Sequence, residues 1–311
     1  MGTLIMRLRQ ALRRKLDAWR DYPLRDGMTL HDRYRLIRFI GMGSYGLAYE
    51  GIELGTDRRV LMKMNKPSKG RLGIQLLRRE SDLMRQLHHP QIPAWIDYVQ
   101  LGAKELLVTE LKAGRNLEDT VMEDGVVIGE RDALILVRSL VEPLAHLHAA
   151  GYVHRDVRIP NVMLHEGAVS LIDYGLACGI GERLPDELLR GLGEYAADER
   201  HRSPSLVQAS VTAEAERSGS PDIWHSVKRR MRAPSMTSDL YGVGHLMLFL
   251  LYSGYEAPDD RVRSWQEELP LATGTRELIA RLLEGGDGGF RTAEELGEAI
   301  DELLGQMEAE R

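Results

Sequence analysis

The segment Val153-His154-Arg155-Asp156-Val157-Arg158-Ile159-Pro160-Asn161-Val162-Met163-Leu164 carries the motif that decides the fold. It contains His-Arg-Asp and an asparagine five positions after the aspartate. The run Leu171-Ile172-Asp173-Tyr174-Gly175 follows and supplies a second aspartate close to a glycine. Each of these short motifs also occurs by chance in unrelated chains, so their meaning depends on the motifs that accompany them.

Three further motifs lie upstream. Gly41-Met42-Gly43-Ser44-Tyr45-Gly46 stands between two predicted strands, where glycines allow a hairpin to close over phosphates and to offer N–H donors. It is a poor dinucleotide fingerprint, because a strand and not a helix follows it. Lys63 ends a predicted strand and Glu80 lies in a predicted helix, and each alone is ordinarily a solvated surface residue. Because both follow the glycine-rich turn in the chain, a second interpretation is that the glutamate is buried and holds the lysine, which then binds the α- and β-phosphates of a nucleotide.

With five motifs in this order, the chain resembles the eukaryotic-type protein kinase family, and within it the bacterial serine/threonine kinases. Asp173-Tyr174-Gly175 stands where the family usually has Asp-Phe-Gly. The resemblance covers roughly residues 31–305. It implies the α+β, bilobal protein-kinase fold, with a five-stranded antiparallel N-lobe that carries one helix and a mainly helical C-lobe.

The resemblance also implies the chemistry. Phosphoryl transfer depends mainly on positioning and charge neutralisation, so the enzyme needs metal-binding oxygens and a carboxylate near the attacking hydroxyl. By resemblance, Asn161 and Asp173 bind Mg²⁺ or Mn²⁺, Asp156 accepts the hydroxyl proton, and Lys63 paired with Glu80 holds ATP. The implied activity is transfer of the ATP γ-phosphate to a serine or threonine hydroxyl of a protein. The family pattern assigns further nucleotide contacts to Gly41, Gly43, Ser44, Gly46, Ala48, Thr109, Glu110, Lys112 and Met163.

These nucleotide contacts have distinct implied roles. Thr109 resembles the gatekeeper, the backbone of Glu110 and Lys112 faces the adenine, and Ala48 and Met163 enclose the base.

Other residues resemble the family's internal supports. Asp239 in Ser238-Asp239-Leu240-Tyr241-Gly242 matches the helix aspartate that braces the catalytic loop. Met84, His154 and Tyr174 match the stacked side chains of the active arrangement.

The chain departs from the family pattern at several positions. Arg158 replaces a lysine that contacts the γ-phosphate, and a guanidinium binds phosphate differently from an ammonium. Leu61 replaces a small alanine against the adenine, which predicts a narrower nucleotide pocket. The segment 176–236 lacks Ala-Pro-Glu and is unusually long, and Arg291 resembles an arginine whose usual glutamate partner is missing. Candidate autophosphorylation sites in this segment are Ser203, Ser205, Ser210, Thr212, Ser218 and Ser220, with Lys228, Arg229, Arg230 and Arg232 as phosphate partners.

Apolar periodicity gives the predicted elements. Strands are predicted at 34–40, 47–54, 59–64, 95–99 and 105–111. Helices are predicted at 72–87, 133–150, 238–252, 275–283 and 293–307. We expect an N-lobe in 30–110 and a C-lobe in 111–308, with 179–235 as a loop or partly disordered.

Residues 1–29 are expected to contain a basic amphipathic helix. Leucines at helical spacing alternate with arginines over 4–20, which predicts packing on the body of the protein, or contact with an anionic membrane surface or a partner.

Composition narrows the class of protein. The 311 residues include 41 Lys plus Arg against 47 Asp plus Glu, and the net charge of -6 argues against a nucleic-acid partner. Cys178 is the single cysteine, which fits a reducing compartment. The longest apolar run, 243–252, is too short to span a bilayer and predicts a buried helix. We therefore expect a cytoplasmic protein, peripheral to a membrane if the N-terminal helix binds lipid.

Two alternatives stay open at this point. A small-molecule kinase of the same fold would also lack the peptide-docking motif, although His-Arg-Asp is atypical of antibiotic phosphotransferases. A pseudokinase scaffold would fit Leu61 and the unusual segment 176–236, but it has no physical need for a complete catalytic set.

Overall fold

The computed structural model describes residues 20–43, 46–185, 188, 227, 229–259, 261, 263–284 and 288–309. These residues form two compact units. The N-terminal unit contains the described residues up to His88, Pro93–Leu111, Pro185 and Leu188, and the C-terminal unit contains His89–Ile92, Lys112–Leu184 and the described residues from Val227 onward. Ser44, the expected helix in 4–20 apart from Arg20, Lys228 and the six candidate phosphorylation sites lie outside the described residues.

The N-terminal unit is built on an antiparallel sheet in the order β1-β2-β3-β4-β6-β5. Its strands are β1 (Thr29–Leu30), β2 (Tyr34–Met42), β3 (Gly46–Glu53), β4 (Arg58–Asn65), β5 (Trp95–Leu101) and β6 (Lys104–Glu110). The five predicted strands are present within one to two residues, but the sheet has six strands and not five. The additional strand β1 has only two residues, too few to show an alternating pattern.

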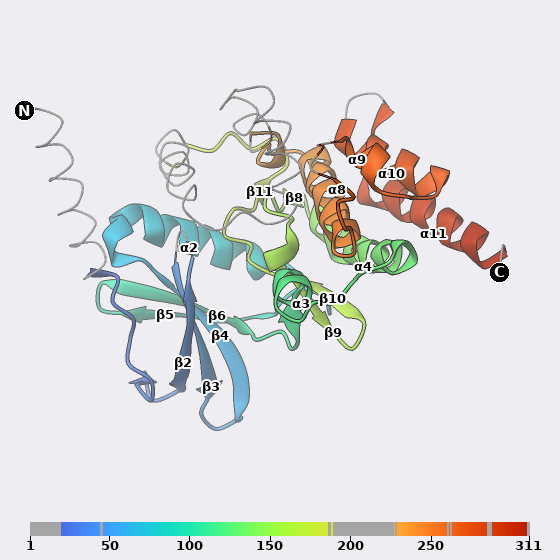
Figure 1. Cartoon of the computed structure of the whole chain (residues 1–311). Coiled ribbons are helices and arrows are strands. Elements are labelled where there is room, and N and C mark those ends of the chain that lie inside the picture. Colours follow the sequence, from blue (N-terminus) through green and yellow to red (C-terminus); the bar gives the residue numbers. More distant parts are fainter. Residues whose placement is uncertain are drawn as a thin grey trace, which may run out of the picture. The chain divides into compact units, whose positions relative to one another are not determined.

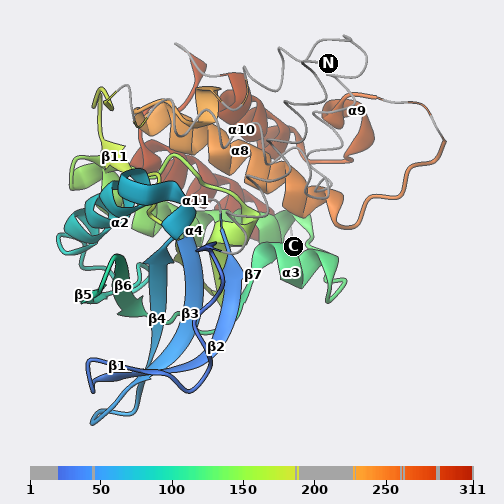
Figure 2. The ribbon, with the colours of Figure 1, turned by 90° about the vertical axis from the view of Figure 1, so that its left-hand side faces the viewer.

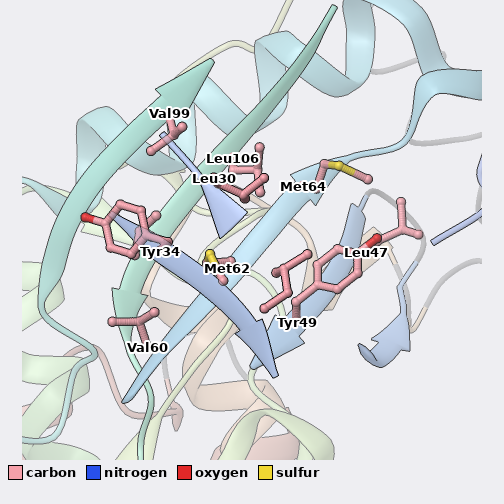
Figure 3. Packing of buried hydrophobic residues seen from close by; sticks show 11 residues of the cluster. Leu30, Tyr34, Leu47, Tyr49, Val60, Met62, Met64, Val99 and Leu106 are labelled. Atoms are coloured by element: carbon pink, nitrogen blue, oxygen red, sulfur yellow. The ribbon is translucent and has the colours of Figure 1, made fainter. Parts of the chain in front are cut away.

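Strand alternation puts one apolar face of this sheet into a core. In β4, Val60, Met62 and Met64 are fully buried, whereas Leu61 and Lys63 between them point to the opposite face. Figure 3 shows how the side chains from different strands converge. The cluster comprises Leu30, Tyr34, Leu36, Leu47, Tyr49, Val60, Met62, Met64, Val99, Leu106 and Val108.

Helix α2 (Gly70–Met84) lies against β4, β5 and β6, as Figures 1 and 2 both show. It follows the 3-10 turn η1 (Pro67–Lys69). Asp21, which is buried, holds this turn by accepting hydrogen bonds from Ser68 N at 2.8 Å and from Ser68 Oγ at 2.6 Å. The chain ahead of the sheet is therefore attached to the start of α2.

The C-terminal unit is mainly helical, as predicted. Its helices are α3 (Leu117–Met122), α4 (Glu130–Ala149), α8 (Met236–Tyr252), α9 (Trp265–Glu268), α10 (Thr273–Glu284) and α11 (Ala293–Ala309). Helix α8 is buried along nearly its whole length and packs against α4 and α10, while α11 packs against α4 (Figure 1). This burial confirms that residues 243–252 belong to a core helix. No described helix is long and apolar enough to cross a membrane.

Short strands in the same unit shape the loops between the helices. A three-stranded sheet joins β7 (Arg115–Asn116), β9 (Val162–His165) and β10 (Ala168–Leu171), and β8 (Tyr152–Val153) pairs with β11 (Cys178–Gly179). Within the segment predicted to be a loop, Gly179 therefore belongs to a strand, and residues 229–231 are helical.

Candidate active site

The N-terminal unit pairs the lysine and the glutamate that the sequence singled out. Lys63 Nζ on β4 lies 2.9 Å from Glu80 Oε1 and 2.7 Å from Glu80 Oε2 on α2. The Glu80 side chain is only 5% exposed, so its charge is compensated by the lysine inside the protein. The pair fixes the lysine ammonium on the face of the sheet opposite the apolar core.

Two other implied nucleotide contacts share this face. Ala48 on β3 is the register partner of Lys63, and Thr109 on β6 is the register partner of Leu61. Side chains of register partners lie on the same side of a sheet. Leu61 is half-buried here. The sheet thus brings Ala48, Lys63 and Thr109 to one surface, which also carries Leu61. The narrower nucleotide pocket expected from Leu61 stays a prediction.

The glycine-rich turn closes as a hairpin between β2 and β3. Gly43 N donates a hydrogen bond to Gly46 O at 2.9 Å, and Gly41 is the register partner of Ala48. A Cβ at Gly46 would lie 2.7 Å from Met64 O, so a side chain cannot be accommodated there. The glycine at this position allows β3 to approach β4 closely.

A buried carboxylate in the C-terminal unit braces the catalytic loop. Asp239 on α8 accepts hydrogen bonds from His154 N at 2.7 Å on Oδ2 and from Arg155 N at 2.7 Å on Oδ1. His148 Nε2 on α4 contributes a third bond to Oδ2 at 2.9 Å. The Asp239 side chain is fully buried. The loop backbone is therefore held by charge-assisted bonds that water does not reach.

The same loop presents Asp156 with two partners. Asn161 Nδ2 donates to Asp156 O at 2.9 Å and to Asp156 Oδ2 at 2.8 Å, which locks the carboxylate orientation. Arg158 Nε lies 3.2 Å from the same Oδ2, and its side chain is 48% exposed. Asp156, Arg158 and Asn161 are thus adjacent, and the asparagine directs its amide nitrogen to the aspartate.

Two residues of the motifs adopt strained backbone conformations. Arg155 and Asp173 both have a φ of 65°. A left-handed φ costs a residue other than glycine about 1–3 kcal/mol, and such strain gathers at functional sites. Asp173 is exposed, and its Oδ1 accepts a hydrogen bond from Gly175 N at 3.3 Å. The Asp173 carboxylate is therefore accessible at the surface of the C-terminal unit.

Tyr174, the residue after Asp173, is buried in the C-terminal unit. Its ring meets the His154 ring edge-on, with the centroids 4.9 Å apart, and its hydroxyl donates to Leu171 O at 3.3 Å. Burial raises the pKa of the Tyr174 hydroxyl well above its ordinary value, so it stays protonated. The Tyr174 hydroxyl, which a phenylalanine would lack, thus has Leu171 O as its hydrogen-bond acceptor and stays uncharged. The third member of the expected stack, Met84, belongs to the N-terminal unit and is buried there.

The Arg155 side chain connects the loop to both the start and the end of the segment 176–236. Its Nε donates to Arg232 O at 2.7 Å and one terminal nitrogen donates to Leu176 O at 3.0 Å. Burial lowers the pKa of the Arg155 guanidinium from its ordinary value. Gly181 N also donates to Pro234 O at 2.7 Å. Main-chain carbonyls therefore anchor the chain just before α8, where Ala-Pro-Glu is missing.

The remaining predicted residues are placed as follows. Glu110 ends β6, where its N–H bonds to Ala94 O at 2.8 Å. Lys112 belongs to the C-terminal unit, and its Nζ donates to Pro90 O at 2.6 Å. Met163 is half-buried on β9. The exposed Arg291 begins the turn before α11, where its N–H donates to Glu295 Oε2 at 2.9 Å.

The donor set of the C-terminal unit suits a hard divalent cation. Asn161 uses its amide nitrogen for Asp156, so its amide oxygen is the atom that could bind a metal, and Asp173 carries a carboxylate. Among the described residues, no group of three or more His, Cys, Asp or Glu side chains could hold a metal by itself. Mg²⁺ commonly binds through one or two side-chain oxygens and completes its octahedron with phosphate and water. Asn161 and Asp173 fit that pattern.

Sequence reasoning missed several residues that support these groups. His148 lies on an apolar helix face, where spacing alone does not indicate a partner. Asp21 lies ahead of the first strand and Glu105 at the start of a strand, positions where a carboxylate is ordinarily solvated. No local signal in the sequence reveals that all three are buried and hydrogen-bonded.

One protein-family model and several known proteins match this sequence. A model described as the protein kinase domain matches residues 34–225. The chain is 28% identical over 265 residues to the probable serine/threonine-protein kinase YbdM of Bacillus subtilis, with 85% of this chain and 86% of that protein covered. It is 35% identical over 173 residues to the hormonally up-regulated neu tumor-associated kinase homolog of Xenopus tropicalis. That alignment covers 53% of this chain and 25% of the frog protein.

Proposed function

Because the chain belongs to the protein kinase family, we propose that it transfers the γ-phosphate of ATP to serine or threonine hydroxyls of a protein in a Mg²⁺-dependent reaction. The family match covers more than half of the chain, and the Bacillus relative is described as a probable serine/threonine kinase. Mn²⁺ would satisfy the same oxygen donors as Mg²⁺.

The observation that carries this proposal is the arrangement of the catalytic loop. Asn161 orients the Asp156 carboxylate, and Asp239 fixes the backbone just before it. A base must be positioned before it can accept a proton during attack, and such positioning accounts for much of phosphoryl-transfer catalysis. An interaction scaffold would have no need of an oriented carboxylate.

Each group then has a defined task. Asp156 orients the attacking hydroxyl and takes its proton, and Lys63, held by Glu80, binds the α- and β-phosphates. Arg158 stabilises charge on the transferred phosphoryl group. When bound, Mg²⁺ would neutralise charge on the phosphate oxygens, and Asn161 and Asp173 would hold it.

The test is phosphate transfer from γ-labelled ATP, to the protein itself and to generic basic proteins. Asp156→Ala and Asp173→Ala are each expected to reduce transfer by at least about 100-fold. Asp301→Ala is the matched control, since this carboxylate of the same unit is 56% exposed and pairs with Arg138 at 2.8 Å. Phosphoamino-acid analysis tests the preference for serine and threonine, and EDTA followed by Mg²⁺ or Mn²⁺ tests the metal.

Failure has two distinguishable forms. If wild type transfers no phosphate but ATP and Mg²⁺ raise its unfolding temperature, the nucleotide is used on another substrate and small molecules should be assayed. If neither transfer nor stabilisation occurs at millimolar ATP, the protein is a scaffold and the proposal is wrong. If transfer occurs, mapping the sites shows whether the segment 176–236 is modified.

A further inference from the structure

A second polar brace in the N-terminal unit joins the same elements as the Lys63–Glu80 pair. At its centre is Glu105, the second residue of β6, whose side chain is 8% exposed. Arg78 of α2 donates to both of its carboxylate oxygens, with Nε 2.8 Å from Oε2. Tyr98 of β5 donates its hydroxyl to Oε2 at 2.5 Å. The Glu105 N–H donates to Asn65 Oδ1 of β4 at 2.7 Å.

This brace lies next to the catalytic pair in sequence and in structure. Arg78 precedes Glu80 by two residues on α2, and Asn65 follows Lys63 by two residues on β4. Neither Glu105 nor its partners belong to the kinase motifs that the sequence carries.

Helix geometry gives the brace its meaning. Residues two positions apart on an α-helix project about 200° apart around the axis. The apolar face of α2 already packs against the sheet and limits rotation of the helix. The Glu80 pair and the bidentate contact at Arg78 project in different directions from the axis, so together they restrict the remaining rotation more than either contact alone. A third contact attaches α2 to β5: Trp95 Nε1 donates a hydrogen bond at 2.9 Å to Oγ of Ser81, the residue after Glu80.

We propose that Glu105 is a positioning residue, which holds α2 in the rotation that places Glu80 on Lys63. It acts through Arg78 and does not touch the reacting atoms. This inference rests on the phosphotransferase activity proposed above. The bidentate arginine and the tyrosine compensate the charge of the buried carboxylate, so the brace is a rigid polar network.

The sheet offers a matched control pair. Glu53 at the end of β3 is also a buried carboxylate, and Arg33 donates to its Oε1 from Nε at 3.0 Å and from a terminal nitrogen at 2.7 Å. This pair connects β3 to the residue before β2 and has no described hydrogen bond to α2. Glu53→Gln therefore removes an equivalent interaction without loosening the helix.

The experiment compares Glu105→Gln with Glu53→Gln by steady-state phosphate transfer and by hydrogen exchange. For Glu105→Gln we expect kcat/KM for ATP to fall by about 10-fold or more, with KM for the protein substrate unchanged. The amides of α2 should exchange at least about 10-fold faster than in wild type. Glu53→Gln should change kcat/KM by less than about 2-fold. Arg78→Lys, which keeps one charge-assisted bond, should recover part of the activity that Arg78→Met loses.

Several outcomes would overturn the inference. Equal losses of activity in Glu105→Gln and Glu53→Gln would show that the brace only stabilises the fold. Unchanged exchange in α2 would show that the helix is held without it. If Glu105→Gln does not fold, Arg78→Met decides the question, because Arg78 is 54% exposed and its truncation leaves the core intact. A wild type without transfer activity would refute the proposed function, and hydrogen exchange would still decide whether Glu105 holds α2.

Discussion

Replacing Asp239 by asparagine tests the brace of the catalytic loop most directly. Both oxygens of the carboxylate are used, Oδ1 by Arg155 N and Oδ2 by His154 N and His148 Nε2, at 2.7 to 2.9 Å. Asparagine has the same shape but offers one acceptor oxygen and one NH₂ group. Whichever way the amide turns, at least one backbone N–H of the loop then faces another donor.

The magnitude follows from these bonds. A buried donor left without an acceptor costs about 1–3 kcal/mol, and the loss of the charge weakens each remaining bond, since hydrogen bonds to charged groups contribute about 1.5–3 kcal/mol. We therefore expect Asp239→Asn to lower the free energy of unfolding by about 3–5 kcal/mol. For a unit of this size that corresponds to a fall of roughly 6–20 °C in the unfolding temperature.

Urea denaturation followed by circular dichroism at 222 nm measures this loss, because most of the helix lies in the C-terminal unit. The control is Asp259→Asn, which disrupts an exposed pair with Arg263 and should cost less than about 1 kcal/mol. Phosphate transfer should fall with the Asp239 variant even below its unfolding temperature, because the loop backbone loosens. A loss below about 1 kcal/mol in Asp239→Asn would refute the view that this carboxylate holds the loop.

Three further outcomes are expected. Lys63→Met should lower kcat/KM for ATP by at least about 100-fold in the transfer assay, because the ammonium held by Glu80 is removed from the phosphates. Burial lowers the pKa of His245 from 6.5 to about 4, so the folded state binds its proton less readily than the unfolded state. Stability should therefore decrease by about 3 kcal/mol as the pH falls from 6.5 to about 4, and denaturation of His245→Gln should lack that decrease. Gly114→Ala should destabilise by more than about 2 kcal/mol in urea denaturation, because φ is 96° and a Cβ would lie 2.1 Å from Leu164 O; an unchanged midpoint would contradict this.

The elements of the fold are predictable where a pattern extends over many residues. In β4, the alternation of Val60, Met62 and Met64 with Leu61 and Lys63 is enough to assign both faces of the strand. Helix α8 is predictable because its apolar residues continue for several turns. Motif order also singles out the catalytic loop, although the bonds that hold it come from residues distant in the chain.

The supports of the site are not predictable, because their partners are far apart in the sequence. Glu105 meets Arg78 across 27 positions, and Asp21 meets Ser68 across 47. A lone acidic residue at the start of a strand gives no periodic signal, and its usual place is in solvent. Strand β1 escapes prediction because its two residues are too few to show an alternating pattern, although they pair with β2 and Leu36 N donates to Met28 O just before them.

The contact between Asp21 and Ser68 determines how the catalytic module could be cut out or joined to another protein. The family match starts at Tyr34, but a fragment beginning there would lack the carboxylate that caps the turn before α2. It would also lose the Leu24 N–H that bonds to the Tyr49 hydroxyl at 3.1 Å. The family match therefore starts after residues that make these contacts with the N-terminal unit. The portable module begins at or before Asp21, and a fusion junction belongs upstream of that residue.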